Sequence, residues 1–174
     1  MNVTKTNIIL IGMAGSGKSV IGRMLADKLS RVFIDTDTLI EQTVGCPLQE
    51  VIDTKGAMEF RRIEEDVLLQ VDLSNYVIAT GGSSIYSHAG MMHLKQSGLV
   101  VLLDVDLAVL SERVNNVATR GLVKRPEQKF AELFLERLPL YRKYADITIA
   151  CAGMNRQEVC RVIIHRCQDA GIIL

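Results

Sequence analysis

The sequence has no excess of either charge and no long hydrophobic run. Its 20 basic and 20 acidic side chains cancel to a formal net charge of zero, so no positive field favours a nucleic acid or an anionic membrane surface. The apolar runs Ile8–Ile11 and Leu99–Leu103 are far shorter than the ~20 residues of a membrane span, and the first is too short for a signal-peptide core. We therefore expect a cytoplasmic protein whose partner is a small molecule.

Metal motifs, redox motifs and domain linkers are also missing. The four cysteines form no C-x-x-C pair and the three histidines are scattered, so neither set predicts a metal cluster or a catalytic triad. Cys160 and Cys167 lie seven residues apart, the spacing of two side chains on one helical face, and we expect ordinary buried thiols. Without a Pro/Ser-rich linker or an internal repeat, 174 residues predict a single domain over 1–174, which we expect to be a monomer.

Residues 12–19 spell G-x-x-x-x-G-K-[ST], the pattern of a phosphate-binding loop. They follow the apolar run 7–11 and lead into a helical pattern at 20–26, which is the setting that this motif requires. Successive backbone N–H groups of such a loop cradle phosphates, Lys18 spans the β- and γ-phosphates, and Ser19 holds Mg²⁺. The sequence therefore predicts a nucleoside triphosphate site formed by Gly12, Ala14, Gly15, Ser16, Gly17, Lys18 and Ser19.

Short apolar runs alternate with longer helical patterns. Parallel strands are covered by helices on both faces, so they read as continuous apolar runs. Apolar spacings of three and four predict crossover helices at Arg61–Leu73 and Leu107–Val117. The sequence thus predicts an α/β protein with the three-layer α/β/α P-loop kinase fold and a five-stranded parallel sheet. The expected strands are Asn7–Ile11, Val32–Ile34, Tyr76–Ala79, Leu99–Leu103 and Ile147–Ala150.

The segment at about 115–129 is polar and carries Gly121, Pro126 and four basic side chains. It is either an ordinary exposed loop or a mobile lid. Loops of this length inside a compact domain are uncommon unless they act as lids, so we favour a lid.

Two carboxylates follow the second expected strand, where ligands bind in open α/β sheets. Asp35 and Asp37 can divide labour, one reaching Mg²⁺ and the other accepting the proton of an acceptor hydroxyl. Alternatively, Asp37 simply caps a helix that begins at Thr38.

Further candidates for the acceptor side lie in the middle and at the end of the chain. Gly81 and Gly82 follow the third expected strand and allow close backbone approach to a ligand, although a tight turn would use the same residues. Arg61 and Arg137 carry guanidinium groups, which bind carboxylates or phosphates bidentately; each considered singly is more often a surface residue. Asp104 follows the fourth expected strand, and we interpret it as a strand-end residue rather than a second acidic motif.

These elements, in this order, resemble the shikimate kinases. The resemblance rests on G-M-A-G-S-G-K-S-V-I-G-R-M-L-A, D-T-D, G-x-x-x-F-R-x-x-E over 56–64, T-G-G, K-R-P and R-L-P-L-Y-R-K-Y-A-D. It runs from the loop to Asp146, nearly the whole chain. It implies an ATP- and Mg²⁺-dependent kinase that phosphorylates a hydroxyl of a small hydroxy acid, the 3-hydroxyl of shikimate.

The resemblance also implies roles for individual residues. Ser19 and Asp35 are similar to the Mg²⁺ site, Asp37 to the residue that deprotonates the acceptor, and Arg125 to the lid arginine that closes onto the phosphates and contributes to catalysis with Lys18. Acceptor binding would fall to Asp37, Arg61, Gly81, Gly82 and Arg137, with the two arginines clamping a carboxylate. The adenine-contacting loop of the family falls near 151–155.

The chain departs from the family pattern at positions that touch the acceptor. Ser83 stands where the family usually has a third glycine, Glu127 and Gln128 where it usually has leucines, and Ala57 where it usually has glutamate. The alternatives are therefore a kinase of another small polyol or hydroxy acid, such as gluconate, and a nucleotide-binding module without transfer activity.

Overall fold

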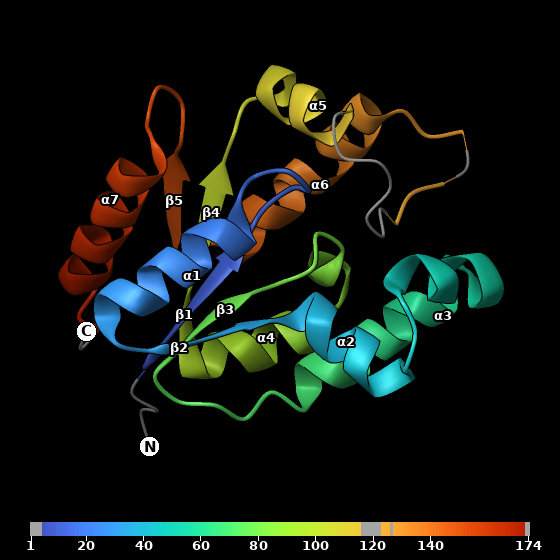
Figure 1. Cartoon of the computed structure of the whole chain (residues 1–174), viewed down its shortest axis with the longest axis horizontal. Helices are drawn as coiled ribbons and strands as arrows, with labels where there is room; N and C mark the ends of the chain where they lie inside the picture. The colour runs from blue at the N-terminus through green and yellow to red at the C-terminus, as the bar shows by residue number, and fades with distance from the viewer. Residues whose placement is uncertain (1–4, 116–122, 126, 173–174) are drawn as a thin grey trace.

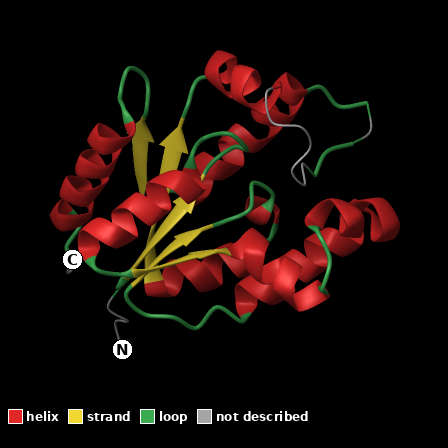
Figure 2. Cartoon of the chain, viewed as in Figure 1, coloured by secondary structure: helices red, strands yellow, loops and turns green. Residues whose placement is uncertain are grey.

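The fold is built on one parallel sheet of five strands (Figures 1 and 2). The computed structural model describes residues 5–115, 123–125 and 127–172. The strand order is β2-β3-β1-β4-β5, which confirms the predicted α/β class. The strands are β1 (Asn7–Ile11), β2 (Val32–Asp35), β3 (Tyr76–Ala79), β4 (Gly98–Asp104) and β5 (Ile147–Ala150).

Helices connect the strands and cover both faces of the sheet. Within the described ranges, none of them is both long and apolar enough to cross a membrane. The helices are α1 (Lys18–Leu29), α2 (Thr36–Val44), α3 (Leu48–Leu69), α4 (His88–Ser97), α5 (Leu107–Asn115), α6 (Phe130–Tyr144), α7 (Arg156–Asp169) and the short 3₁₀ helix η1 (Ser84–Tyr86).

The central strand β1 contributes to two hydrophobic clusters, one on each face. Ile8 and Leu10 pack with residues of α1 and α7, whereas Ile9 and Ile11 pack with residues of α4 and α6. All four side chains are fully buried. A strand covered on both sides needs apolar residues at every position, which explains why the strands read as uninterrupted apolar runs.

The sheet also fixes where a ligand can bind. Strands β2 and β3 lie on one side of β1, and β4 and β5 lie on the other. The chain therefore changes direction across the sheet at β1, and crevices of open α/β sheets form at such a switch point, beyond the carboxyl ends of the strands. The loop 12–17 leaves β1 at this place.

Helix α3 differs most from the sequence prediction. The apolar spacing predicts a helix over 61–73, but α3 spans Leu48–Leu69 with a break at Gly56, whose φ of 82° and ψ of 165° are not helical. The predicted end at Leu73 is wrong because Val71 stays buried after the chain has left the helix. The apolar spacing therefore continues beyond Leu69, where the helix has already ended.

The region predicted as a lid is described only in part. Helix α5 ends at Asn115, and residues 116–122 and 126 lie outside the described residues, as does the predicted end of this helix at Val117. In the described part, Val123 is buried in a cluster with residues of α2 and α3. The segment therefore runs from a contact with α2 and α3 into the start of α6.

Candidate active site

The loop between β1 and α1 forms a cradle around the ammonium group of Lys18. Gly15 and Gly17 have φ angles of 82° and 94°, values that residues with a side chain rarely adopt. The Lys18 ammonium donates to the carbonyl oxygens of Gly12 at 2.7 Å and Met13 at 3.0 Å. The cation is therefore held inside the loop that we predict to bind phosphates.

Burial lowers the pKa of Lys18 from 10.5 to about 8, and the nearby carboxylates of Asp37 and Asp35 oppose this shift. A pKa of about 8 leaves the ammonium group largely protonated at neutral pH. Lys18 is therefore a buried positive charge that an incoming polyphosphate would stabilise.

Ser19 and Asp35 present two oxygen ligands side by side. The Ser19 hydroxyl donates to Oδ2 of Asp35 at 2.6 Å, and Oδ1 of Asp35 accepts from the backbone N–H of Asp37 at 3.1 Å. A hydroxyl and a carboxylate are ligands that Mg²⁺ takes, with water and phosphate oxygens completing its coordination. The two side chains therefore fit the magnesium site that the sequence predicts.

The helix cap is Asp35 and not Asp37. Helix α2 begins at Thr36, and the side chain of Asp35 caps it. The alternative that Asp37 merely caps a helix beginning at Thr38 is therefore wrong. Asp37 lies in the first helical turn, where its carboxyl is free to face the pocket.

Asp37 is a buried carboxyl with an unusual pKa. Desolvation and the charge of Asp35 raise its pKa from 3.8 to about 6, while Lys18 acts in the opposite direction. Gly81 lies directly against it, since a Cβ at that position would be 2.5 Å from Oδ1 of Asp37 and 2.6 Å from Oε1 of Glu64. The absence of a side chain at Gly81 is therefore needed by two carboxyl groups of the protein itself, and the predicted close approach to a ligand remains a prediction.

Glu64 is a site residue to which the sequence assigns no role. It is 1% exposed, and burial raises its pKa to about 7, partly offset by a hydrogen bond from Ser83. Among the described residues, its Oε1 and the Nε of Arg61 are the buried side-chain atoms without a hydrogen-bond partner. The sequence feature that could have identified Glu64 as a site residue is its place at the end of the G-x-x-x-F-R-x-x-E stretch. The structure places this buried carboxyl group next to Asp37, with Gly81 against both.

The two predicted clamp arginines meet at one aromatic ring. The guanidinium carbon of Arg61 lies 4.0 Å from the ring centroid of Tyr86, and that of Arg137 lies 5.3 Å from it. Arg137 is 1% exposed and donates to the carbonyl oxygen of Val123 at 2.6 Å. A Cβ at Gly82 would lie 3.0 Å from Nη1 of Arg137. Arg137 is therefore not the solvated surface residue that was the alternative, and Arg61 is partly buried.

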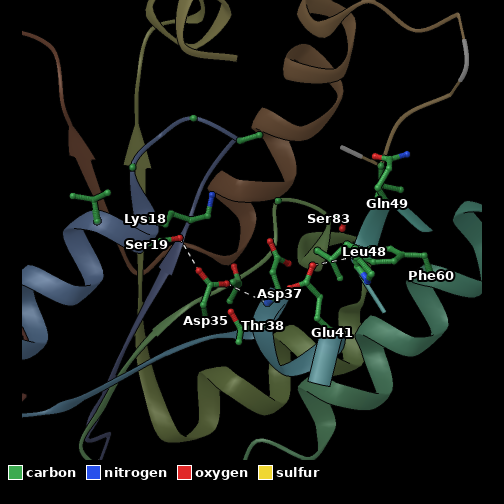
Figure 3. A pocket seen from close by; sticks show the side chains of 18 of the residues that line it. Lys18, Ser19, Asp35, Asp37, Thr38, Glu41, Leu48, Gln49, Phe60 and Ser83 are labelled. Carbon is green, nitrogen blue, oxygen red and sulfur yellow. Dashed lines mark hydrogen bonds between the residues drawn. The ribbon is translucent and has the colours of Figure 1, made fainter. Parts of the chain in front are cut away.

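A pocket of about 640 Å³ joins most of these groups. In Figure 3, Ser19 and Asp35 lie at one end, Leu48, Gln49 and Phe60 at the other, and Asp37 between them. Such a gradient from a charged to an apolar end suits a ligand with a charged and a carbon-rich part. The lining includes Ala14, Gly15, Gly17, Lys18, Ser19, Asp35, Asp37, Gly82, Ser83 and Arg137.

Some predicted site residues lie off this pocket. Gly12, Ser16, Arg61, Gly81 and Arg125 are not among its described lining residues. The carbonyl oxygen of Gly12 accepts from the ammonium group of Lys18. Gly81 is covered by the carboxyl groups of Asp37 and Glu64. The structure thus brings the predicted acceptor residues together, whereas Arg125, predicted at the phosphates, lies off this pocket.

Arg125 is paired with a carboxylate rather than directed at the phosphate-binding loop. Its Nη2 lies 3.0 Å from Oε2 of Glu136, and its side chain is 77% exposed. The role predicted for Arg125 at the phosphates requires a different position and remains a prediction.

A second pocket of about 390 Å³ opens on the other side of the phosphate-binding loop. Ser16 and Gly17 line it together with Arg113 of α5 and the turn 151–154 after β5. The guanidinium of Arg113 donates to the carbonyl oxygen of Gly15 at 3.0 Å. The sequence points to this turn for adenine, but it does not indicate Arg113.

Two further expectations concern residues outside the site. Asp104 ends β4 and lies 3.8 Å from Nη2 of Arg142, which confirms it as a strand-end residue. Cys160 and Cys167 are free thiols buried in one cluster, as predicted, whereas Cys46 and Cys151 are only partly buried.

Comparison with known proteins gives one consistent family. The sequence profile described as "Shikimate kinase" matches residues 14–168. A shikimate kinase of Thermodesulfovibrio yellowstonii is 37% identical over 161 residues, which cover 91% of this chain and 92% of the relative.

Similar solved structures include members of the same family. The shikimate kinase of Acinetobacter baumannii in complex with shikimate has a TM-score of 0.85 and 32% identity, covering 97% of this chain and 96% of that one. The shikimate kinase of Aquifex aeolicus has a TM-score of 0.81 and 30% identity, with coverages of 95% and 98%.

Proposed function

The chain belongs to the shikimate kinase family, and from this premise we propose that it transfers the γ-phosphoryl group of ATP to the 3-hydroxyl of shikimate. One observation carries the proposal: the buried carboxyl of Asp37 lines the same pocket as Lys18 and Ser19 of the phosphate-binding loop and as the predicted clamp residue Arg137. Phosphoryl transfer needs a proton acceptor between a donor site and an acceptor site. Asp37 would occupy that place.

The triphosphate would bind in the cradle of residues 12–19. Lys18 now donates to two backbone carbonyls of the loop, and in the complex its ammonium would donate to phosphate oxygens, while Arg113 and the turn 151–154 would hold the nucleoside in the second pocket. Ser19 and Asp35 would hold Mg²⁺. When bound there, the metal supplies positive charge beside the β- and γ-phosphate oxygens.

On the acceptor side, Asp37 would orient the reacting hydroxyl and take up its proton. A carboxyl with a pKa of about 6 is ionised at neutral pH and yet more basic than an ordinary aspartate, which suits a general base. Arg61 and Arg137 would bind the carboxylate of the acceptor through charge-assisted hydrogen bonds. The donor and acceptor would thus be fixed in one geometry, which is the main source of rate in such transfers.

A coupled ADP-release assay tests this function. Shikimate, quinate, gluconate, homoserine and nucleoside monophosphates are offered in turn with ATP and Mg²⁺. We expect turnover with shikimate to exceed turnover with every other acceptor. Preference for gluconate or another polyol would support the second candidate, and ATP binding without any phosphorylated product would support a non-catalytic module.

The pH dependence of the reaction follows from the titration of Asp37. We expect kcat/KM for shikimate at saturating ATP to fall as the pH is lowered through about 6, because protonated Asp37 cannot accept the proton of the acceptor. The profile would be measured from pH 5 to 8.5. Since Glu64 has a pKa of about 7, the same profile is recorded for Glu64→Gln. The acid limb should persist in that variant, and a flat profile down to pH 5 would remove Asp37 as the base.

The departure at Ser83 is tested by Ser83→Ala. The side chain of this buried residue lies close enough to Glu64 to hold down the pKa of that carboxyl, so loss of the hydroxyl should lower the free energy of unfolding by about 1–2 kcal/mol. Because the hydroxyl faces Glu64, KM for shikimate should change by less than about threefold, a shift that corresponds to under ~1 kcal/mol.

The control for Ser83→Ala is Ser84→Ala. Ser84 is fully buried and its hydroxyl donates to the hydroxyl of Thr80 at 3.1 Å. Unlike Ser83, it is not among the described residues that line the pocket. It should lose similar stability. A tenfold change in the preference for shikimate over quinate in Ser83→Ala alone would show that Ser83 selects the acceptor.

A further inference from the structure

Glu136 connects Arg125 with the arginine clamp. It lies on α6 next to Arg137, and its Oε2 accepts from Nη2 of Arg125 at 3.0 Å and from Nε2 of Gln128 at 2.8 Å. The hydroxyl of Tyr86 donates to its Oε1. One carboxylate therefore receives three donors, two from the segment 125–128 and one from η1.

The contacts of Tyr86 extend this network to the acceptor site. Its ring faces the guanidinium groups of Arg61 and Arg137, and its hydroxyl lies 3.4 Å from Nε of Arg137. The hydrogen bond from Tyr86 lowers the pKa of Glu136, as do Gln128 and the charge of Arg125. Glu136 is therefore an ionised carboxylate anchored beside the clamp.

Gln128 fixes the segment that carries Arg125. Its side chain is 7% exposed, its Oε1 accepts from the backbone N–H of Arg125 at 3.3 Å, and its carbonyl accepts from Lys124 at 3.0 Å. A buried amide that bonds both Glu136 and the backbone of Arg125 specifies one position for that arginine. The ion pair between Arg125 and Glu136 is thus supported by a buried side chain and is not only a contact between two exposed charges.

We propose that Glu136 is a positioning residue that holds Arg125 beside the acceptor clamp and competes with the phosphates of ATP for its guanidinium. The inference rests on the proposed function and on the role at the phosphates that the sequence predicts for Arg125. Arg125 does not line the phosphate pocket among the described residues, and Glu136 accepts from its guanidinium, so we expect it to leave Glu136 when it binds the phosphates. Each ATP that Arg125 engages must therefore displace this ion pair.

Glu136→Gln tests the competition. The amide oxygen can still accept from Tyr86, but the charge that holds Arg125 is gone. Exposed ion pairs contribute ~0.2–1 kcal/mol, so we expect a non-hydrolysable ATP analogue with Mg²⁺ to bind about 1.4- to 5-fold tighter by calorimetry. KM for shikimate should change by less than about twofold, because the hydroxyl of Tyr86 keeps its acceptor.

Two further variants distinguish this competition from a general effect of removing a negative charge. Glu127→Gln removes an exposed charge from the same segment and should leave the affinity unchanged. In an Arg125→Ala background, Glu136→Gln should no longer tighten binding, as a double-mutant cycle requires. Equal tightening with and without Arg125, or none in the single variant, would overturn the inference. Wild-type turnover of shikimate is recorded alongside, so that failure of the proposed function is recognised separately.

Discussion

Asp37→Asn is expected to lose about 10²- to 10⁴-fold in kcat, the usual contribution of a positioned general base. Asparagine keeps the size and can still contact a hydroxyl, but it cannot take up the proton. Binding of the ATP analogue should change by less than about twofold, because the cradle of residues 12–19 is untouched. Single-turnover rates and calorimetry with the purified variant measure the two quantities.

The same substitution is expected to stabilise the protein in the absence of ligands. The folded state binds a proton at Asp37 more tightly than the unfolded chain, since its pKa is raised from 3.8 to about 6. The stability associated with this group is thus present below pH 3.8 and is lost as the pH rises through 6. Asp37→Asn should therefore unfold at higher denaturant concentration at pH 7.5, by on the order of 1–3 kcal/mol, and this gain should shrink towards pH 4.

The matched control is Asp66→Asn, which removes an exposed carboxylate that lies 3.7 Å from Arg62. Neither turnover nor stability should change by more than the small effect of a surface ion pair. Loss of turnover in Asp37→Asn together with loss of stability would indicate misfolding, and near-normal turnover would remove Asp37 from the mechanism.

Arg137→Lys is expected to raise KM for shikimate by about 10- to 100-fold, which corresponds to the loss of hydrogen bonds to a charged group. Lysine keeps the charge but not the planar pair of donors. Because Arg137 is remote from proton transfer in the proposed arrangement, kcat at saturating shikimate should fall far less than KM rises. Initial rates over a wide range of shikimate concentration separate the two parameters.

The free energy of unfolding of Arg137→Lys provides a second measurement. The carbonyl oxygen of Val123, which now accepts from Arg137 at 2.6 Å, would lose its donor, and a buried unpaired acceptor costs about 1–3 kcal/mol. Arg142→Lys is the control, since Arg142 lies on the same helix with a side chain that is 61% exposed. An unchanged KM for shikimate in Arg137→Lys would contradict the clamp.

The donor half of the site could be predicted because its chemistry is contiguous in sequence. Residues 12–17 form one loop that leads directly into α1 at Lys18, and a glycine such as Gly17, with φ of 94°, is needed wherever that loop occurs. Asp35 and Asp37 were predictable for a similar reason, because they directly follow a strand. Only the helix cap was assigned to the wrong aspartate, and it is decided by a helix start two residues earlier than expected.

The acceptor half depends on contacts between distant residues, which no local pattern shows. Tyr86 and Arg137 are 51 positions apart, and no spacing in the sequence indicates that one ring faces both clamp arginines. Glu64 has the appearance of an ordinary charged helical residue until the fold buries it beside Asp37. The partner of Arg125 is likewise set by the packing of α6 and not by the basic composition of its own segment.

Identification of the product tests the central claim most directly. The protein is incubated with ATP, Mg²⁺ and shikimate, and the product is examined by phosphorus–proton correlation NMR, which shows the carbon that carries the phosphate. The proposed site predicts one phosphorylated product, with the phosphate on the 3-hydroxyl, formed in step with ADP. A phosphate on another hydroxyl, or ADP release without phosphorylated shikimate, would contradict it.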